Sequence, residues 1–283
     1  MIWRRAGALP AAEKVDAWLG SLPGATADER AAASLARTRL ASTGHPGHEW
    51  FARADAPTVM IQTLGGFAVI VGGEVVPPAA WQSRKARDLL RILVARRGRP
   101  VPREELAELL WPGEDAGKVA HRLSVALSIL RKVLDRGRGR DAAAEVIRAD
   151  ASRVALDRSR VEIDVFTFLD GAGYALREGA VPALSTVERA YTGDFLEDEP
   201  YEDLSVSLRE EARALYLQVL RALAELAERD ADAVRYLHRL LDKDPYDMRA
   251  HRDLVARLTR SGALGEARRA GERHAAALRA LGR

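Results

Sequence analysis

Apolar residues return every three or four positions between Gly117 and Leu134, in the clearest periodic pattern of the chain. They are Val119, Leu123, Leu127, Leu130 and Leu134. This spacing predicts one helix with a single apolar face. A solvated helix face usually mixes both signs of charge, but the opposite face here has no acid. It carries Lys118, His121, Arg122, Ser124, Val125, Ser128, Arg131 and Lys132. Such a face suits a polyanion, and an ordinary core helix with a basic outer face fits the pattern equally well.

Two shorter helices are expected before this basic helix. Arg84–Arg97 has an apolar stripe and ends at Gly98; the stripe is formed by Ala86, Leu89, Leu90, Leu93 and Val94. The next helix starts at Pro102 and ends before Trp111-Pro112-Gly113, with glutamates in its first turn that suit the positive helix end. Glu114-Asp115-Ala116 then leads into the basic helix. Two helices joined by a short turn, with the second one basic, are typical of a helix-turn-helix.

Runs typical of strands flank these helices. Between Val59 and Val76, β-rich runs are separated by two glycine pairs, which predicts hairpin turns in a small antiparallel sheet. After the basic helix, residues 145–148 and 153–156 are strand-like and residues 149–152 form the turn between them. A hairpin directly after a recognition helix is a wing. It would bring Arg148 and Arg153 near a phosphate backbone or minor groove, unless they are ordinary surface arginines.

From Val161 onward the chain is expected to be helical. The predicted helices are Val181–Tyr191, Leu208–Arg229, Ala231–Leu241, Pro245–Thr259 and Leu264–Leu281, with an acidic loop over Asp194–Asp203. Asp244 as a cap, with Pro245 at the first helical position, predicts a strong helix start. Paired helices at this spacing approximate the tetratricopeptide period of about 34 residues. Stacks of this kind serve binding more often than chemistry.

Charge is distributed unevenly, although the net charge is only +3. Between Trp81 and Arg140, 15 Lys/Arg face 7 Asp/Glu, whereas between Asp141 and Ser205, 15 Asp/Glu face 6 Lys/Arg. This division indicates one region that meets a polyanion and one that avoids it, unless charges cluster by chance in an Ala/Arg-rich sequence. No apolar run approaches the roughly 18 residues that span a membrane. We therefore expect a soluble cytoplasmic protein without a signal peptide and without a membrane partner.

Catalytic and metal-binding motifs are missing from the sequence. The absence of cysteine excludes disulfides, thiolate metal sites and cysteine catalysis. There is no Gly-x-Ser-x-Gly, His-Glu-x-x-His or phosphate-binding glycine loop, so we expect no catalytic residues, no metal and no cofactor. A metal site at His45, His48 and Glu49 is disfavoured, because an intervening Pro-Gly is typical of a turn. The remaining candidates, His238, His251 and His274, fall on separate predicted helices and are expected to be core or surface histidines.

Several stretches, in their order along the chain, are similar to a known family. Trp81–Pro112, then Leu123–Asp135 and the hairpin, resemble an OmpR-type winged helix. Tyr191–Ala227 and Leu240–Gly282 resemble the bacterial transcriptional activator domain. Together, over roughly Thr58 to Gly282, they resemble the SARP-type activators. The expected fold is mainly α with a small β component. It comprises a helical lead-in of unclear role over 1–56, a winged helix-turn-helix over 57–158 and an all-α, tetratricopeptide-like activator domain over 159–283.

The resemblance implies a function and the residues that carry it. The chain would be a sequence-specific transcriptional activator, not an enzyme, that binds promoter repeats through its winged helix and recruits RNA polymerase holoenzyme. A homodimer on DNA is also a family expectation. Base-reading positions correspond to His121, Arg122, Ser124, Val125 and Ser128. Phosphate contacts are expected from Arg84, Lys85, Lys118, Arg131, Lys132, Arg148 and Arg153. The loop that faces RNA polymerase would contain Trp111, Pro112, Glu114 and Asp115.

Two positions depart from the family pattern. Ile129 stands where a basic residue is common, and the hairpin turn Ala149–Ser152 lacks the usual glycine and tyrosine. Both departures favour an alternative hypothesis, in which the chain is a tetratricopeptide-like scaffold that binds a protein or small ligand and has weak or vestigial DNA binding.

Overall fold

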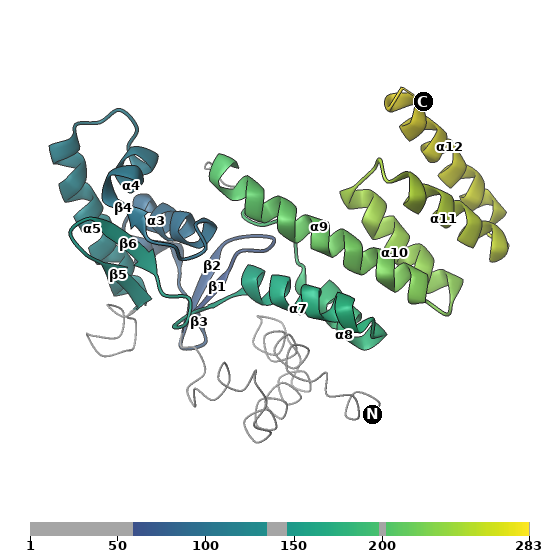
Figure 1. Ribbon diagram of the computed structural model, residues 1–283, viewed down its shortest axis with the longest axis horizontal. Helices are drawn as coiled ribbons and strands as arrows, with labels where there is room; N and C mark the ends of the chain where they lie inside the picture. The colour runs from purple at the N-terminus through teal and green to yellow at the C-terminus, as the bar shows by residue number, and fades with distance from the viewer. Residues whose placement is uncertain (1–58, 135–145, 198–201, 283) are drawn as a thin grey trace, which may run out of the picture. The chain divides into compact units, whose positions relative to one another are not determined.

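The computed structural model describes residues 59–134, 146–197 and 202–282 (Figure 1). The expected helical lead-in and the motif of His45, His48 and Glu49 lie outside these residues. The described chain divides into two compact units. One contains residues 59–134, 146–167, 192–197 and 202–210, and the other contains residues 168–191 and 211–282. The predicted division at residue 158 stays a prediction, and the unit that contains the winged helix continues to Thr167.

A four-stranded sheet opens the first unit. Its strands are β1 (Val59–Gln62), β2 (Ala68–Val71), β3 (Glu74–Val75) and β7 (Glu162–Ile163), in the order β3-β2-β1-β7. The turns at the two glycine pairs join antiparallel strands, as predicted. The sheet is not purely antiparallel, however, because β7 pairs with β1 in parallel. The expectation of helix from Val161 onward is wrong for β7, because a strand of two residues has no readable period.

One buried carboxylate joins the end of β1 to the start of α7 (Asp164–Glu178). Asp164 accepts hydrogen bonds from the backbone N–H groups of Thr63 (2.8 Å), Leu64 (2.9 Å) and Val165 (2.7 Å), and from the Thr63 hydroxyl. Burial raises the pKa of the Asp164 carboxyl above its ordinary value, and these hydrogen bonds act in the opposite direction. The chain beside Thr63 also approaches residues 192–194 so closely that a Cβ on Gly65, whose φ is +68°, would lie 2.7 Å from the carbonyl oxygen of Thr192.

The winged helix follows β3 in the first unit (Figure 1). It consists of a short 3-10 helix η3 (Pro78–Trp81), α3 (Arg84–Ala95), β4 (Val101–Pro102), α4 (Arg103–Leu110), α5 (Ala116–Leu134), β5 (Ile147–Ala149) and β6 (Arg153–Leu156). The three helices and the hairpin are confirmed, and the α3 stripe is buried as predicted. The helix start predicted at Pro102 is one residue early, because Pro102 pairs with Arg153 in β4. This pairing makes a three-stranded sheet in the order β4-β6-β5.

The rest of the chain is helical. The helices are α7, α8 (Val181–Ala190), α9 (Glu202–Leu226), α10 (Asp230–Lys243), α11 (Met248–Arg260) and α12 (Leu264–Ala280). In the second unit α10 packs against α11 and α11 against α12 (Figure 1). The helix start predicted at Asp244-Pro245 is wrong. Asp247 is the N-cap of α11, and its carboxylate accepts from the Ala250 N–H at 2.9 Å. The Asp244 carboxylate instead accepts from the Tyr246 N–H within the preceding turn (3.1 Å).

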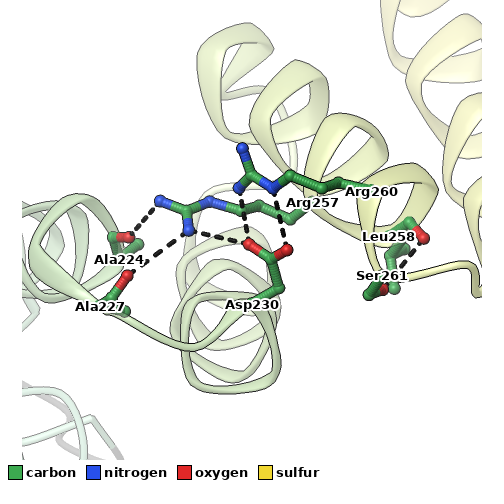
Figure 2. A network of polar contacts seen from close by, with 7 residues as sticks. All are labelled: Ala224, Ala227, Asp230, Arg257, Leu258, Arg260 and Ser261. Atoms are coloured by element: carbon green, nitrogen blue, oxygen red, sulfur yellow. Dashed lines mark hydrogen bonds and ion pairs between the residues drawn. The ribbon is translucent and has the colours of Figure 1, made fainter.

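An aspartate at the start of α10 ties together three helices of the second unit (Figure 2). Asp230 accepts from Arg257 (2.9 Å) and from Arg260 (2.6 and 2.9 Å), both on α11. Arg257 also donates to the carbonyl oxygens of Ala224 on α9 (3.1 Å) and of Ala227 just after it (3.5 Å). Hydrogen bonds from the two arginines hold the pKa of the Asp230 carboxyl well below its ordinary range. The junction is therefore fixed by charge as well as by apolar packing.

Aromatic stacking also fixes the helices of the second unit. The rings of Tyr191 and Tyr216 are stacked, with centroids 4.1 Å apart. His251 and His274 lie on separate helices, as predicted, and their rings are stacked with centroids 5.4 Å apart because α11 and α12 are adjacent. His251 is buried and its Nε2 donates to the carbonyl oxygen of Pro245 at 2.9 Å. It is therefore a core histidine, as predicted.

Candidate nucleic-acid interface

The two faces of α5 are separated as the sequence predicts. The apolar stripe is at most 2% exposed at each of its five positions, and Ala126 and Val133 are buried with it. At about 100° per residue, the opposite side is centred on Val125, which is 45% exposed. The exposed residues around Val125 are Lys118, His121, Arg122, Ser124, Ser128 and Lys132. All five proposed base-reading residues therefore lie on the solvent-facing side of one helix.

The loop before α5 fixes the start of the helix. Gly113, at a φ of +72°, turns the chain after Trp111, and the Glu114 N–H donates to the Trp111 carbonyl oxygen at 3.3 Å. The carbonyl oxygen of Asp115 accepts from the N–H groups of Lys118 and Val119, and its carboxylate also accepts from the Lys118 N–H at 3.2 Å. Asp115 therefore caps α5, whereas Pro112, Glu114 and Asp115 are all exposed and Trp111 is partly exposed.

Arg122 has an acidic partner that the periodic pattern did not reveal. Its Nη1 forms an ion pair with Oε2 of Glu114, across the turn between α4 and α5. Both side chains stay accessible, at 47% and 41% exposure. The helix itself has no acid on this face, but the preceding loop supplies one. A separation of eight residues across a helix start is not a helical spacing, so inspection of the helix alone could not find the pair.

The wing is braced by residues at its turn. The Asp150 carboxylate accepts from the N–H groups of Ser152 (2.7 Å) and Arg153 (2.8 Å), and these bonds hold its pKa below the ordinary value. Arg103, at the start of α4, donates from Nε to the Asp150 carbonyl oxygen at 3.0 Å. The sequence assigned no role to Arg103. An aspartate-based turn thus replaces the expected glycine and tyrosine.

The proposed phosphate-binding residues differ in accessibility. Arg84, Lys118, Lys132 and Arg153 are exposed. Arg131 is only partly exposed and its Nη2 donates to the Ile147 carbonyl oxygen at 3.4 Å, so it connects α5 to β5. Arg148 forms an ion pair with Asp157 at 2.5 Å. Lys85 is partly buried.

Two further arginines of α3 serve the core. Arg87 donates to the Phe67 carbonyl oxygen at 3.1 Å, and the Arg91 guanidinium lies 4.5 Å from the centre of the Phe67 ring. Arg91 also pairs with Asp88 at 3.2 Å, and both are buried. Part of the positive charge of this region is therefore internal, and the available surface charge is smaller than the sequence suggests.

Other chemistries find no site in the part of the chain that the structure describes. In residues 59–134, 146–197 and 202–282, no three His, Asp or Glu side chains are grouped so that they could hold a metal ion. None of the helices in these ranges combines the length and apolarity that a membrane crossing requires.

Comparison with known proteins identifies the winged helix. Residues 80–149 match the family model "Transcriptional regulatory protein, C terminal", which is a model of regulators and not of enzymes. A solved structure of Mycobacterium tuberculosis EmbR in complex with a low affinity phosphopeptide has a similar fold, with a TM-score of 0.61 and 22% identity. The match covers 78% of this chain and 60% of that one, so this chain spans about 60% of the length of EmbR as solved. A search of curated proteins gives no match. The predicted order, a winged helix of OmpR/PhoB type followed by a helical region, is confirmed.

Proposed function

We propose that this chain, which carries the winged helix of a DNA-binding transcriptional regulator, is a sequence-specific activator whose α5 reads promoter repeats in the major groove. The observation that supports this most directly is the solvent-facing side of α5, where basic and small polar side chains surround Val125 with no acid on the helix itself. A braced wing, β5 and β6, is the next pair of strands along the described chain. The face and the wing are the two parts that a winged helix presents to a duplex.

Base reading would rest mainly on Arg122. An arginine can donate two hydrogen bonds to O6 and N7 of a guanine, and such a contact is worth about 1–3 kcal/mol of discrimination. Val125, at the centre of the face, suits a thymine methyl group. His121 and Ser128 would supply smaller polar contacts. Ser124 donates its hydroxyl to the Ala120 carbonyl oxygen at 3.0 Å, so it would meet a base as an acceptor.

Affinity would come from the phosphate backbone. Each neutralised phosphate steepens the salt dependence of binding by a slope of about 0.9. The exposed cations Arg84, Lys118, Lys132 and Arg153 would therefore give a slope of roughly −3 to −4. Lys85, Arg131 and Arg148 would contribute less, because Lys85 is partly buried, Arg131 is bonded to β5 and Arg148 is paired with Asp157.

Activation would use two other surfaces. The loop Trp111–Asp115, which joins α4 to α5 and is exposed from Pro112 to Asp115, would face RNA polymerase. The helical unit would pair two protomers on adjacent half-sites. The phosphopeptide in the EmbR structure belongs to that complex, and the proposal for this chain rests on its own basic face.

A binding titration tests the DNA-reading part of the proposal. Promoter fragments and scrambled competitors are titrated over a range of salt with wild type, Arg122→Ala and Lys132→Ala. Arg122→Ala should lower the preference for promoter over scrambled DNA by about 5- to 150-fold. Lys132→Ala should weaken all sequences equally and reduce the salt slope by about one. Arg252→Ala, which removes an exposed arginine of α11, is the control and should change neither quantity.

A scaffold remains the second candidate because the reading face is apolar at its centre. Val125 is exposed there, and Ile129, beside it, is partly exposed where a basic residue is expected. On this reading the helical unit binds a protein partner and the winged helix binds DNA weakly. The same titration separates the two functions, because a scaffold shows no preference for any promoter fragment over its scrambled competitor.

A further inference from the structure

The ion pair between Glu114 and Arg122 is selective at the level of single atoms. The carboxylate contacts Nη1 of the guanidinium. An arginine has five N–H donors in a fixed planar fork. A carboxylate on Nη1 leaves the edge formed by Nε and Nη2, whose two parallel N–H groups are the pair that matches O6 and N7 of guanine. The ion pair and a bidentate base contact are therefore compatible in the same arginine.

Glu114 is well placed to act as a fixed anchor. Its own N–H is bonded to the Trp111 carbonyl oxygen, and the next residue, Asp115, caps α5 through its backbone and side chain. The Glu114 backbone is thereby held between the end of α4 and the capped start of α5, the helix that carries Arg122. Among the described residues, no other ion pair is formed by either side chain.

We propose that Glu114 is a specificity-determining positioning residue, which holds Arg122 by Nη1 so that its Nε–Nη2 edge faces a guanine. This inference rests on the proposed function, because it requires that Arg122 reads a base. An arginine that is already held loses less conformational freedom when it binds, and each immobilised long side chain accounts for roughly a 2- to 10-fold factor in binding. Glu114 itself touches no base.

The same carboxylate has an opposite effect on overall affinity. A negative charge beside the reading face repels phosphates of every sequence, whereas its orienting effect acts only where Arg122 meets its guanine. Glu114 thus lowers the affinity for every sequence and raises the preference for the guanine sequence, as repulsive elements in specific interfaces do. A purely structural residue has a different signature, since its loss weakens binding to all sequences together.

A double-mutant cycle tests the inference with the whole chain. The four proteins are wild type, Glu114→Gln, Arg122→Ala and the double variant, and Glu108→Gln is the control. Glu108 is exposed on α4 and forms no ion pair among the described residues. The substitution Glu108→Gln therefore removes the same charge as Glu114→Gln without breaking a contact with an arginine. Each protein is titrated with two duplexes. The first is the sequence that the wild type binds most tightly in a selection from random duplexes. In the second, the guanine whose replacement lowers wild-type affinity most is changed to adenine.

The expected result has three parts. Glu114→Gln binds the adenine duplex more tightly than wild type, yet its preference for the guanine duplex falls about 2- to 10-fold. In the Arg122→Ala background, the same change leaves the preference unaltered. Glu108→Gln keeps the wild-type preference.

Failure of the inference is distinguishable from failure of the proposed function. If Arg122→Ala removes the preference and Glu114→Gln keeps it in full, the pair is an ordinary surface ion pair and the inference is wrong. If Glu114→Gln lowers the preference by the same factor with and without Arg122, the effect does not act through Arg122 and the inference is again wrong. If Arg122→Ala leaves the preference unchanged, base reading by Arg122 and the inference are both overturned.

Discussion

Replacing Asp164 by alanine should strongly destabilise the unit that contains the winged helix. The carboxylate accepts hydrogen bonds from the N–H groups of Thr63, Leu64 and Val165 and from the Thr63 hydroxyl, and these residues are buried. Alanine offers no acceptor in its place. The substitution therefore leaves several donors without a partner in a site that is only 2% exposed at Asp164.

The magnitude follows from the donors that cannot find another acceptor. The N–H groups of Thr63 and Leu64 are fixed by the backbone, and each buried unsatisfied donor costs about 1–3 kcal/mol. The Thr63 hydroxyl can rotate, and the Val165 N–H lies in the first turn of a helix, where N–H groups lack intrahelical partners in any case. A water molecule that enters the vacated space lowers the cost. We expect the free energy of unfolding to fall by about 3–4 kcal/mol, a large share of the ~5–15 kcal/mol typical of a domain.

Urea unfolding at pH 7, followed by far-UV circular dichroism, measures this loss. With a slope of about 2–3 kcal/mol per molar, the midpoint should fall by about 1–2 M. Asp170→Ala is the matched control, because Asp170 is exposed on the same helix and should change the midpoint little. Asp164→Asn should be intermediate, since the amide keeps one acceptor oxygen but turns an NH₂ group toward N–H donors.

Either of two results would refute this reasoning. A midpoint of Asp164→Ala within about 0.3 M of that of Asp170→Ala would mean that the N–H donors of Thr63 and Leu64 do not depend on the carboxylate. An Asp164→Asn variant as stable as wild type would mean that one acceptor oxygen suffices, and the carboxylate would then have no special role.

Three further predictions concern Asp230, Tyr216 and Asp150. Asp230→Asn should lower the thermal midpoint and speed amide exchange in α11 more than Asp242→Asn on the exposed face of α10, because it removes the negative charge and one of the two acceptor oxygens that Arg257 and Arg260 share. Equal effects would contradict this. Burial raises the pKa of the Tyr216 phenol from 10.0 to about 12, so the fold favours the neutral phenol and should lose stability as pH rises from 10 toward 12, by at most ~1.4 kcal/mol per pH unit. In Tyr216→Phe that slope should be absent from urea midpoints, and an unchanged slope would assign it to other groups. Asp150→Ala should loosen the wing turn and weaken DNA binding equally for operator and competitor, and a change in their ratio would show that the wing also reads bases.

Long amphipathic segments were predictable from the sequence, and their faces were predicted as well. The five residues of the α5 stripe are all core, and Val125, on the opposite side, is an exposed large apolar residue, because a helix of this length repeats its pattern over several turns. The buried stripe of α3 was predicted from its pattern in the same way. The sequence did not predict strands β4 and β7. Each has two residues, which is too short for a hydrophobic period, and each is defined only by its pairing with another strand.

The sequence did not predict the N-cap of α11 or the ion pair between Glu114 and Arg122. Aspartate is a typical N-cap residue at both 244 and 247, and the N-cap of α11 is Asp247, which also pairs with Arg221 from α9. The pair of Glu114 and Arg122 spans the turn before α5, so neither the helical period nor the strand period connects its two members. The exposed positions of the candidate interface could thus be predicted from α5 alone. Glu114, the acid that pairs with Arg122 on this face, comes from the loop before α5.

The pairing of β1 with β7 has a consequence for how the chain is made. Met60 pairs with Glu162, so during synthesis the whole winged helix emerges between the two halves of one ladder. At about 5–20 residues per second, the outer edge of β1 stays open for roughly 5–20 s, and the N–H groups of Thr63 and Leu64, just after β1, lack Asp164 for the same time. Open strand edges are the usual starting points of aggregation. Nascent chains that stall between residues 76 and 161 should therefore aggregate more readily than chains that stall after Asp164, because only the latter can close this edge.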